Sequence, residues 1–321
     1  GQAAKFIDEV CWRTYWKGWL EGRPSIWSNY LKELESDRAS WGEDADYLGP
    51  IRGDSGIDCM DAWTRELKET GYLHNHARMW YASIWTHTLR LPWTLGAAFF
   101  LEHLLDGDAA SNTLGWRWVA GLHTQGKSYL ASRGNIQKYT KQNFQVNVEL
   151  AKEPIDLSDY ADRPPHRPPS PLPGLPQSGR IGLLLHDDDL SAAEWLRSEV
   201  PVNCVAALLP NAAYAANGIS ERVTQFRRDC LTATLNEADT LCATEAAVLD
   251  WAQTEQLQHV VMAQPFVGIW DSVTPSLAQM LKNHGIQLTT ARHWWDAHFF
   301  PHAKAGFFRF KKAIPAALEQ L

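Results

Sequence analysis

The chain has 321 residues, of which 45% are hydrophobic and 21% are charged, as is typical of soluble globular proteins. This length suits two domains and supplies enough apolar residues for a sizeable core. The net charge of −7 excludes tight DNA binding through a bulk positive field, so any DNA contact needs a local basic patch. The 16 tryptophans predict either a large aromatic core or a role in stacking on bases or a flat cofactor, or in passing electrons between indoles.

Cysteine usage and the N-terminus bear on the cellular setting. The five cysteines are odd in number and none has CxxC spacing, which favours a reduced, cytoplasmic protein. No signal peptide and no apolar run long enough to span a membrane is found, so no membrane partner is expected. Gly1 leads directly into a helical pattern without an initiator Met, which predicts a fragment or a processed chain.

The first half is predicted to be all-helical. Apolar residues recur on a helical period over residues 3–20, 58–70, 73–90 and 94–105, and no alternating strand pattern is found before residue 150. We therefore predict a helical domain over residues 1–150.

A proline-rich segment follows. Eight prolines lie between residues 154 and 176, and proline lacks an amide donor, so this stretch does not suit a core element. Residues 151–179 are predicted to be an extended linker, with a long surface loop inside one domain as the alternative.

The second half is predicted to be a Rossmann-like α/β domain over residues 180–321. Helical stretches from Ser191, over 219–235, 244–256 and 272–284, separate short apolar runs. Buried strands that alternate with helices indicate a parallel sheet covered on both faces. No phosphate-loop motif is present, and a packing domain without a ligand is the alternative interpretation. The four apolar runs are Ile181–His186, Val202–Leu209, Val260–Phe266 and Ile286–Thr290.

Two motifs of the first half place functional side chains on single helical faces. In the segment Glu9-Val10-Cys11-Trp12-Arg13, the spacing puts Glu9, Trp12 and Arg13 on one face, although a surface salt bridge over a core tryptophan gives the same spacing. In Gly71–Met79, residues Asn75, Arg78 and Met79 share a face, and a structural role for His74 and His76 is the alternative there.

A third motif contains two carboxylates, Asp106 and Asp108, followed by Asn112 and by Trp116-Arg117-Trp118. Two carboxylates at this spacing are compatible with a metal ion or with a solvated helix N-cap, and we assign no metal site.

Taken together, the three motifs resemble the FAD-binding half of DNA photolyases and cryptochromes. That family has, in this order, a glutamate followed by Trp-Arg, a His-Asn-x-x-Arg-Met segment, and Asp-Gly-Asp-x-x-x-Asn ahead of Trp-x-Trp. The resemblance covers about residues 4–140. It implies that the all-helical domain binds FAD. Together with the strand and helix pattern of the second half, this predicts a multidomain protein in which an all-helical FAD-binding domain is followed by the Rossmann-like α/β domain.

The resemblance implies a flavin site. Asn75 matches the asparagine whose amide faces flavin N5, and Phe6 matches the position of an aromatic beside the adenine. Arg78 matches the arginine that pairs with Asp106 beside the isoalloxazine, and we expect this ion pair to be buried. The family binds the FAD phosphates with a loop and several helices that lie before the glutamate, and the sequence from Gly1 to Glu9 has no counterpart of them. The implied FAD-binding residues are Phe6, Arg13, His74, Asn75, Arg78, Asp106, Asp108 and Asn112.

The resemblance also implies a pocket for a flipped-out pyrimidine dimer, formed by Glu9, Trp12, Met79 and Trp118. Photolyases that act on (6-4) lesions have histidines at the positions of Asn75 and Met79, so this sequence favours cyclobutane dimers or light sensing over (6-4) lesions. Arg117 and Lys127 are candidates for the basic patch, with ordinary surface charges as the alternative.

The resemblance also implies which tryptophans carry electrons to the flavin. Trp116 and Trp93 match the first two members of the tryptophan chain that photoreduces the flavin, and Trp41 is the nearest candidate for the third. With Asn75, these tryptophans are the expected catalytic residues.

The implied activity is blue-light-driven repair of cyclobutane pyrimidine dimers in DNA by electron transfer from reduced FAD. The chain is expected to act as a monomer on dimer-containing DNA. A cryptochrome-like photoreceptor without repair activity and a flavin-free structural relic are the rival hypotheses.

The α/β domain departs from the family pattern because it follows the helical domain instead of preceding it. Trp295–His302 and Gly306–Lys311 faintly resemble the end of the family's antenna domain. This implies either a permuted domain order or a different α/β module, and the antenna chromophore is unknown.

Overall fold

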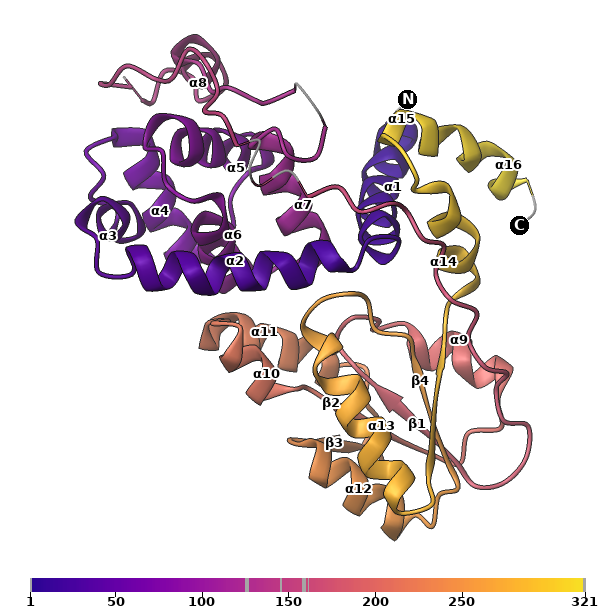
Figure 1. The fold of residues 1–321 in the computed structure, drawn as a ribbon. Helices are drawn as coiled ribbons and strands as arrows, with labels where there is room; N and C mark the ends of the chain where they lie inside the picture. The colour runs from indigo at the N-terminus through magenta and orange to yellow at the C-terminus, as the bar shows by residue number, and fades with distance from the viewer. Residues whose placement is uncertain (1, 125–126, 145, 158–159, 161, 320–321) are drawn as a thin grey trace. The chain divides into compact units, whose positions relative to one another are not determined.

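The computed structural model describes residues 2–124, 127–144, 146–157, 160 and 162–319, without the side chains of residues 2–4 and 317 (Figure 1). The chain forms two compact units. We call Pro24–Pro165 the helical unit, and Gly1–Arg23 together with His166–Leu321 the α/β unit. The boundary near residue 165 falls within the predicted linker, but the first helix groups with the second half of the chain and not with the other helices.

The helical unit contains no strand among its described residues. The predicted helix over 58–70 is confirmed, whereas the one over 73–90 changes at Ile84 into a π-helix, in which the turn is wider by one residue. Its elements are α2 (Ser25–Trp41), α3 (Ala45–Arg52), α4 (Asp58–Thr70), α5 (Asn75–Ser83), η1 (Ile84–Thr88), α6 (Trp93–His103), α7 (Ala109–Val119) and α8 (Arg133–Tyr139).

The core of the helical unit is strongly aromatic. Tyr81 and Trp85 are fully buried, and Trp93 and Trp116 are at most 3% exposed. Much of the high tryptophan content therefore serves the core, as one of the two interpretations of the composition predicted.

The α/β unit contains a five-stranded, entirely parallel sheet in the order β3-β2-β1-β4-β5. This arrangement, with the first part of the chain helical, confirms the predicted fold class. The strands are β1 (Ile181–Leu185), β2 (Cys204–Leu208), β3 (Thr240–Cys242), β4 (His259–Ala263) and β5 (Gln287–Ala291). The intervening helices are α9 (Ala192–Glu199), α10 (Asn211–Ala216), α11 (Glu221–Thr232), α12 (Glu245–Thr254), η3 (Ile269–Asp271) and α13 (Val273–Asn283).

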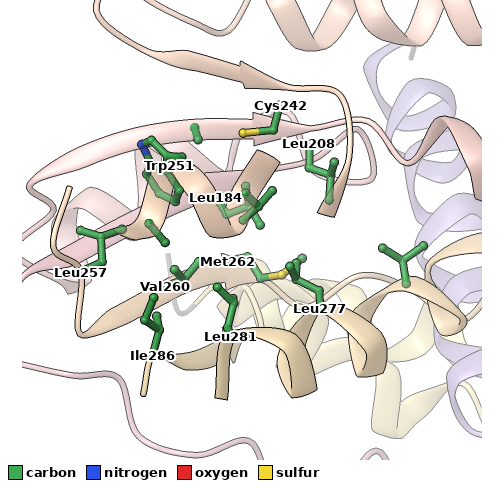
Figure 2. Close-up of a cluster of buried hydrophobic side chains, with 14 of the residues drawn as sticks. Leu184, Leu208, Cys242, Trp251, Leu257, Val260, Met262, Leu277, Leu281 and Ile286 are labelled. Carbon is green, nitrogen blue, oxygen red and sulfur yellow. The ribbon is translucent and has the colours of Figure 1, made fainter. Parts of the chain in front are cut away.

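An apolar cluster joins this sheet to α12 and α13 (Figure 2). Leu184 and Met262 from the strands face Leu277 and Leu281 from α13, and all four are fully buried. Gly182 lies in β1 where a side chain would collide with the ring of Trp251, so only glycine lets α12 pack this closely.

The first helix, α1 (Gln2–Glu21), packs against the C-terminal segment of the same unit. Cys11 and Tyr15 of α1 form a buried cluster with Phe299, Phe307 and Phe310. The C-terminal elements are α14 (Trp294–Phe299), η4 (Phe300–His302), α15 (Phe307–Phe310), η5 (Lys311–Ala313) and α16 (Ile314–Leu318). None of the helices in the described part of the chain combines the length and apolar character needed to cross a membrane.

Candidate functional site

The second and third motifs of the sequence lie side by side in the helical unit. Gly71 ends α4 in the left-handed conformation, with φ of 71°, and its carbonyl accepts a hydrogen bond of 2.9 Å from the amide of Leu105. A Cβ atom on Gly71 would lie 2.6 Å from Cγ of Leu105. Glycine is therefore needed at this position both for its backbone conformation and for the close approach.

Arg78 and Asp106 form the expected ion pair, but the pair is not buried. The guanidinium Nη2 of Arg78 lies 3.0 and 3.1 Å from the two carboxylate oxygens of Asp106. The side chain of Asp106 is 56% exposed and that of Arg78 is 24% exposed, because Asp106 lies in the turn that precedes α7. Nε of Arg78 also donates to the carbonyl of Leu73 at 2.7 Å, which fixes the direction of the guanidinium.

Asn75 and His74 lie at the beginning of α5. His74 is the N-cap, and its Nδ1 accepts a hydrogen bond of 3.2 Å from the amide of His76, which bears out the structural role considered for this residue. Asn75 is exposed, and its amide nitrogen lies 3.9 Å from the sulfur of Met79 one turn later. Asn75 and Met79 therefore share one face of α5, as their spacing predicted.

Asp108 and Asn112 have structural partners in the helical unit. The carboxylate of Asp108 caps α7 by accepting from the amide and the hydroxyl of Ser111, at 2.8 and 2.9 Å. Asn112, one turn later and buried, donates from Nδ2 to the carbonyl of Ala97 at 2.8 Å, which ties α7 to α6. The N-cap interpretation of Asp108 is thus confirmed.

The predicted tryptophan chain is not a line of ring contacts. Among the described residues, the rings around Trp116 are those of Tyr81, Trp85 and Phe100, at centroid distances of 6.5, 6.2 and 5.0 Å. Trp93 contacts Tyr30 at 5.5 Å instead. Trp41 is half-buried at the end of α2 and has no described ring partner.

Arg117 is not part of a surface patch, contrary to the prediction. It is 2% exposed, donates from Nη2 to the carbonyl of Asp162 at 2.9 Å, and its guanidinium carbon lies 5.6 Å from the ring centre of Trp93. Arg117 lies between Trp116 and Trp118 on α7, and the rotation of the helix from one residue to the next turns the Arg117 side chain into the core. The prediction of a surface position was wrong for this reason. Lys127 is exposed.

Trp118 and Met79 are both half-buried in the helical unit. The ring of Trp118 stacks on Tyr129, with centroids 5.8 Å apart and an angle of 26° between the planes. Nothing in the local sequence indicated Tyr129, because it lies in a segment without helical or strand periodicity.

The residues of the first motif lie on α1 and therefore belong to the α/β unit. Glu9 and Arg13 are exposed, and Phe6 is 70% exposed. Trp12 is half-buried and lies flat on Phe307, with ring centroids 3.7 Å apart and planes 9° apart. Phe307, which the sequence did not mark as part of a site, thus covers one face of the predicted stacking residue.

Comparison with known proteins gives the class of the helical region. Residues 6–148 match the FAD binding domain of DNA photolyase. This region is therefore a FAD-binding domain of the photolyase and cryptochrome family, which confirms the resemblance and FAD as its cofactor.

Two curated relatives illustrate the similarity. The chain is 34% identical over 178 residues to the deoxyribodipyrimidine photo-lyase of Streptomyces griseus, and this alignment covers 49% of this chain and 38% of the relative. It is 31% identical over 130 residues to the deoxyribodipyrimidine photo-lyase of Escherichia coli K12, and this alignment covers 40% of this chain and 28% of that relative. The chain thus spans well under half the length of these relatives. No solved structure matches it significantly.

The side chains at the beginning of α5 fit a flavin by their chemistry. The exposed amide of Asn75 and the guanidinium of Arg78 offer N–H donors, and the carboxylate of Asp106 offers acceptors, all reachable from solvent. The edge of an isoalloxazine ring has both carbonyl acceptors and an N–H donor, so a mixed set of this kind is required. The N-termini of α5 and α7 add the positive ends of two helix dipoles, which favour an anionic ligand.

Proposed function

We propose that this protein repairs cyclobutane pyrimidine dimers in DNA under blue light, as a deoxyribodipyrimidine photo-lyase that uses reduced FAD. The single observation that carries the proposal is the Arg78–Asp106 pair beside the exposed Asn75, inside a domain that matches photolyases. When bound, the flavin would supply the absorption of blue light and the single-electron chemistry of the repair.

The protein's part is to hold the flavin and set its charge balance. We assign cofactor binding to Phe6, Arg13, His74, Asn75, Arg78, Asp106, Asp108 and Asn112. Arg78, held by the carbonyl of Leu73, presents its guanidinium in a fixed direction, and Asp106 limits the net positive charge there. Both residues are preorganised in the flavin-free chain, so little ordering is needed on binding.

We assign the lesion to Glu9, Trp12, Met79 and Trp118. A flipped-out dinucleotide needs flat apolar surfaces for its rings and hydrogen-bond partners for its edges. Trp12 packs on Phe307 and Trp118 packs on Tyr129, which holds the two indoles in place for stacking on bases. Asn75 and Met79 stand where (6-4) photolyases have histidines, which supports a cyclobutane substrate.

We propose that residues 1–150 bind the flavin, that residues 151–179 are a linker and that residues 180–321 are an α/β domain. For this α/β domain we propose a permuted antenna domain. The parallel, five-stranded sheet supports this last assignment. We also propose that the protein is a cytoplasmic monomer; all five cysteines are unpaired, as in a reducing compartment.

The test is light-dependent recovery of thymine. The flavin-loaded protein, with an external reductant, is illuminated with an oligonucleotide that contains a cyclobutane thymine dimer, and the products are separated by chromatography. We expect thymine recovery in the light and none in a dark control. Flavin reduction in the light with no recovery on single- or double-stranded substrate would overturn the proposal and leave a cryptochrome-like photoreceptor.

A further inference from the structure

We propose that Trp85 and Tyr47 form the electron-transfer branch that leads away from Trp116, in the role that the sequence assigned to Trp93 and Trp41. The inference rests on the proposed function, which supplies the photoexcited flavin as the oxidant of Trp116. All residues of the branch lie in the helical unit.

The rings of this branch follow one another without a gap. Trp116 and Trp85 are 6.2 Å apart at their centroids, and Trp85 and Tyr47 are 6.0 Å apart. Gly96 on α6 makes this possible, because a side chain there would collide with the ring of Trp116 and approach Nε1 of Trp85 to 3.0 Å. Tyr47, on α3, is half-buried, so the series ends near solvent.

The π-helix positions Trp85. The amide of Leu89 donates to the carbonyl of Ile84 at 2.9 Å, five residues back, and the wider turn places Trp85 differently from a continued α-helix. Such turns are often found at functional sites, and this one holds Trp85 between Tyr47 and Trp116.

Electrostatics favour an electron vacancy on Trp85 over one on Trp93. Nε1 of Trp85 donates to the carbonyl of Pro92 at 2.8 Å, and this hydrogen bond strengthens when the indole becomes positive. Nε1 of Trp93 is buried without an acceptor, and the guanidinium of Arg117 lies 5.6 Å from the ring. A cation at that distance in a buried site opposes a second positive charge.

Tyr47 is the end of the branch, and Tyr81 is not. Oxidation of a tyrosine by one electron releases its phenolic proton, so the residue needs an exit for that proton. Tyr81 is fully buried, and its hydroxyl is engaged with Thr64 at 3.0 Å. Tyr47 is only half-buried. We therefore assign its electron to oxidised Trp85 and its proton to water, and an added thiol later returns an electron and a proton.

The test compares phenylalanine variants of the flavin-loaded protein by transient absorption and by electron paramagnetic resonance after a light pulse. Trp85→Phe is expected to lower the yield of the long-lived radical to the level of Trp116→Phe, and Trp93→Phe is expected to lower it far less. With ring-deuterated tyrosine, the trapped radical signal should narrow in the parent and be lost in Tyr47→Phe.

Trp80→Phe is the matched control. Trp80 is also buried, its Nε1 has no acceptor, and it stacks on Trp63 and not on Trp116. It should bind flavin and give the parental radical yield. In the flavin-free protein, Trp85→Phe and Trp116→Phe should remove the same circular-dichroism component, because their indoles couple.

The outcomes separate the two proposals. Parental radical yield in Trp85→Phe with loss in Trp93→Phe would overturn the branch and leave the proposed function intact. Absence of flavin photoreduction in the parent itself would overturn the branch, whereas the proposed function would still be decided by thymine recovery with chemically reduced flavin.

Discussion

The proposed functional side chains of the helical unit and those of α1 are held in place by different forces. In the helical unit, Arg78, Asp106 and Asp108 are positioned by hydrogen bonds, a helix cap and a glycine turn. On α1, Trp12 is positioned by aromatic packing against Phe307, nearly 300 residues away in sequence. The first region depends on local chemistry and the second on the C-terminal segment, so damage at the two should have different consequences.

Phe307→Ala should have the largest effect on stability. Phe307 is 5% exposed within the cluster that holds α1, and removing such a ring costs about 3–5 kcal/mol. Chemical denaturation of the α/β unit measures this. Phe308→Ala is the matched control, since Phe308 is 79% exposed and its loss should change the free energy of unfolding by no more than about 0.5 kcal/mol. Equal effects of the two changes would contradict the packing account of α1.

Trp12→Ala should weaken binding of dimer-containing DNA without releasing the flavin. Stacking on an aromatic ring contributes about 1–3 kcal/mol per base, so the affinity should fall roughly five- to 150-fold. Titration of a fluorescent lesion-containing oligonucleotide measures the change, and Trp12→Phe should retain most of the affinity. Unchanged binding by Trp12→Ala would exclude α1 from the lesion pocket.

Asp106→Ala should separate flavin retention from stability. Because the ion pair with Arg78 is exposed, its loss should change the free energy of unfolding of the flavin-free protein by only about 1 kcal/mol or less. Flavin retention should nevertheless fall more than in any single variant of residues 180–321. Flavin absorbance per chain after gel filtration measures this, and parental occupancy would show that Asp106 is not a cofactor residue.

Asp296→Asn should produce the smallest change, which is a change in how the free energy of unfolding of the α/β unit depends on pH. Burial raises the pKa of Asp296 to about 6, with Lys17 opposing and Asp189 adding to the shift. Between the pKa values of the unfolded and folded states, the folded state binds a proton that the unfolded state has released. The contribution of Asp296 to stability is therefore fully present below about pH 4 and is lost as the pH rises to about 6. The variant should show a flatter profile of denaturation midpoints across this window, and an unchanged profile would contradict the assignment.

Local patterns in the sequence predicted much of the fold. The runs that became β1, β2, β4 and β5 are short, apolar and bounded by turns, whereas β3 escaped detection because Thr240 and Leu241 are exposed and the strand has only three residues. The pair of Arg78 and Asp106 was predicted from the order of the family's motifs and not from helical periodicity. Motif order does not indicate burial, so the exposure of the pair was not predicted.

Features that depend on contacts between distant parts of the chain could not be predicted from the sequence. The packing of Trp12 on Phe307 joins the two ends of the chain, and no local pattern indicates it. Trp85 passed unnoticed because its place next to Trp116 depends on a π-turn and on the missing side chain of Gly96, neither of which changes hydrophobic periodicity. Arg117 lies in the core because helix rotation, and not charge, decides which way it points.

The identity and amount of the bound chromophore test the central claim most directly. The full-length protein is purified, denatured, and its released chromophore is identified by chromatography and mass spectrometry. The account predicts FAD at about one equivalent per chain, greatly reduced in Asp106→Ala and unchanged in Phe308→Ala. Release of FMN, or of no flavin at all, would contradict the assignment of the helical region as the light-absorbing site.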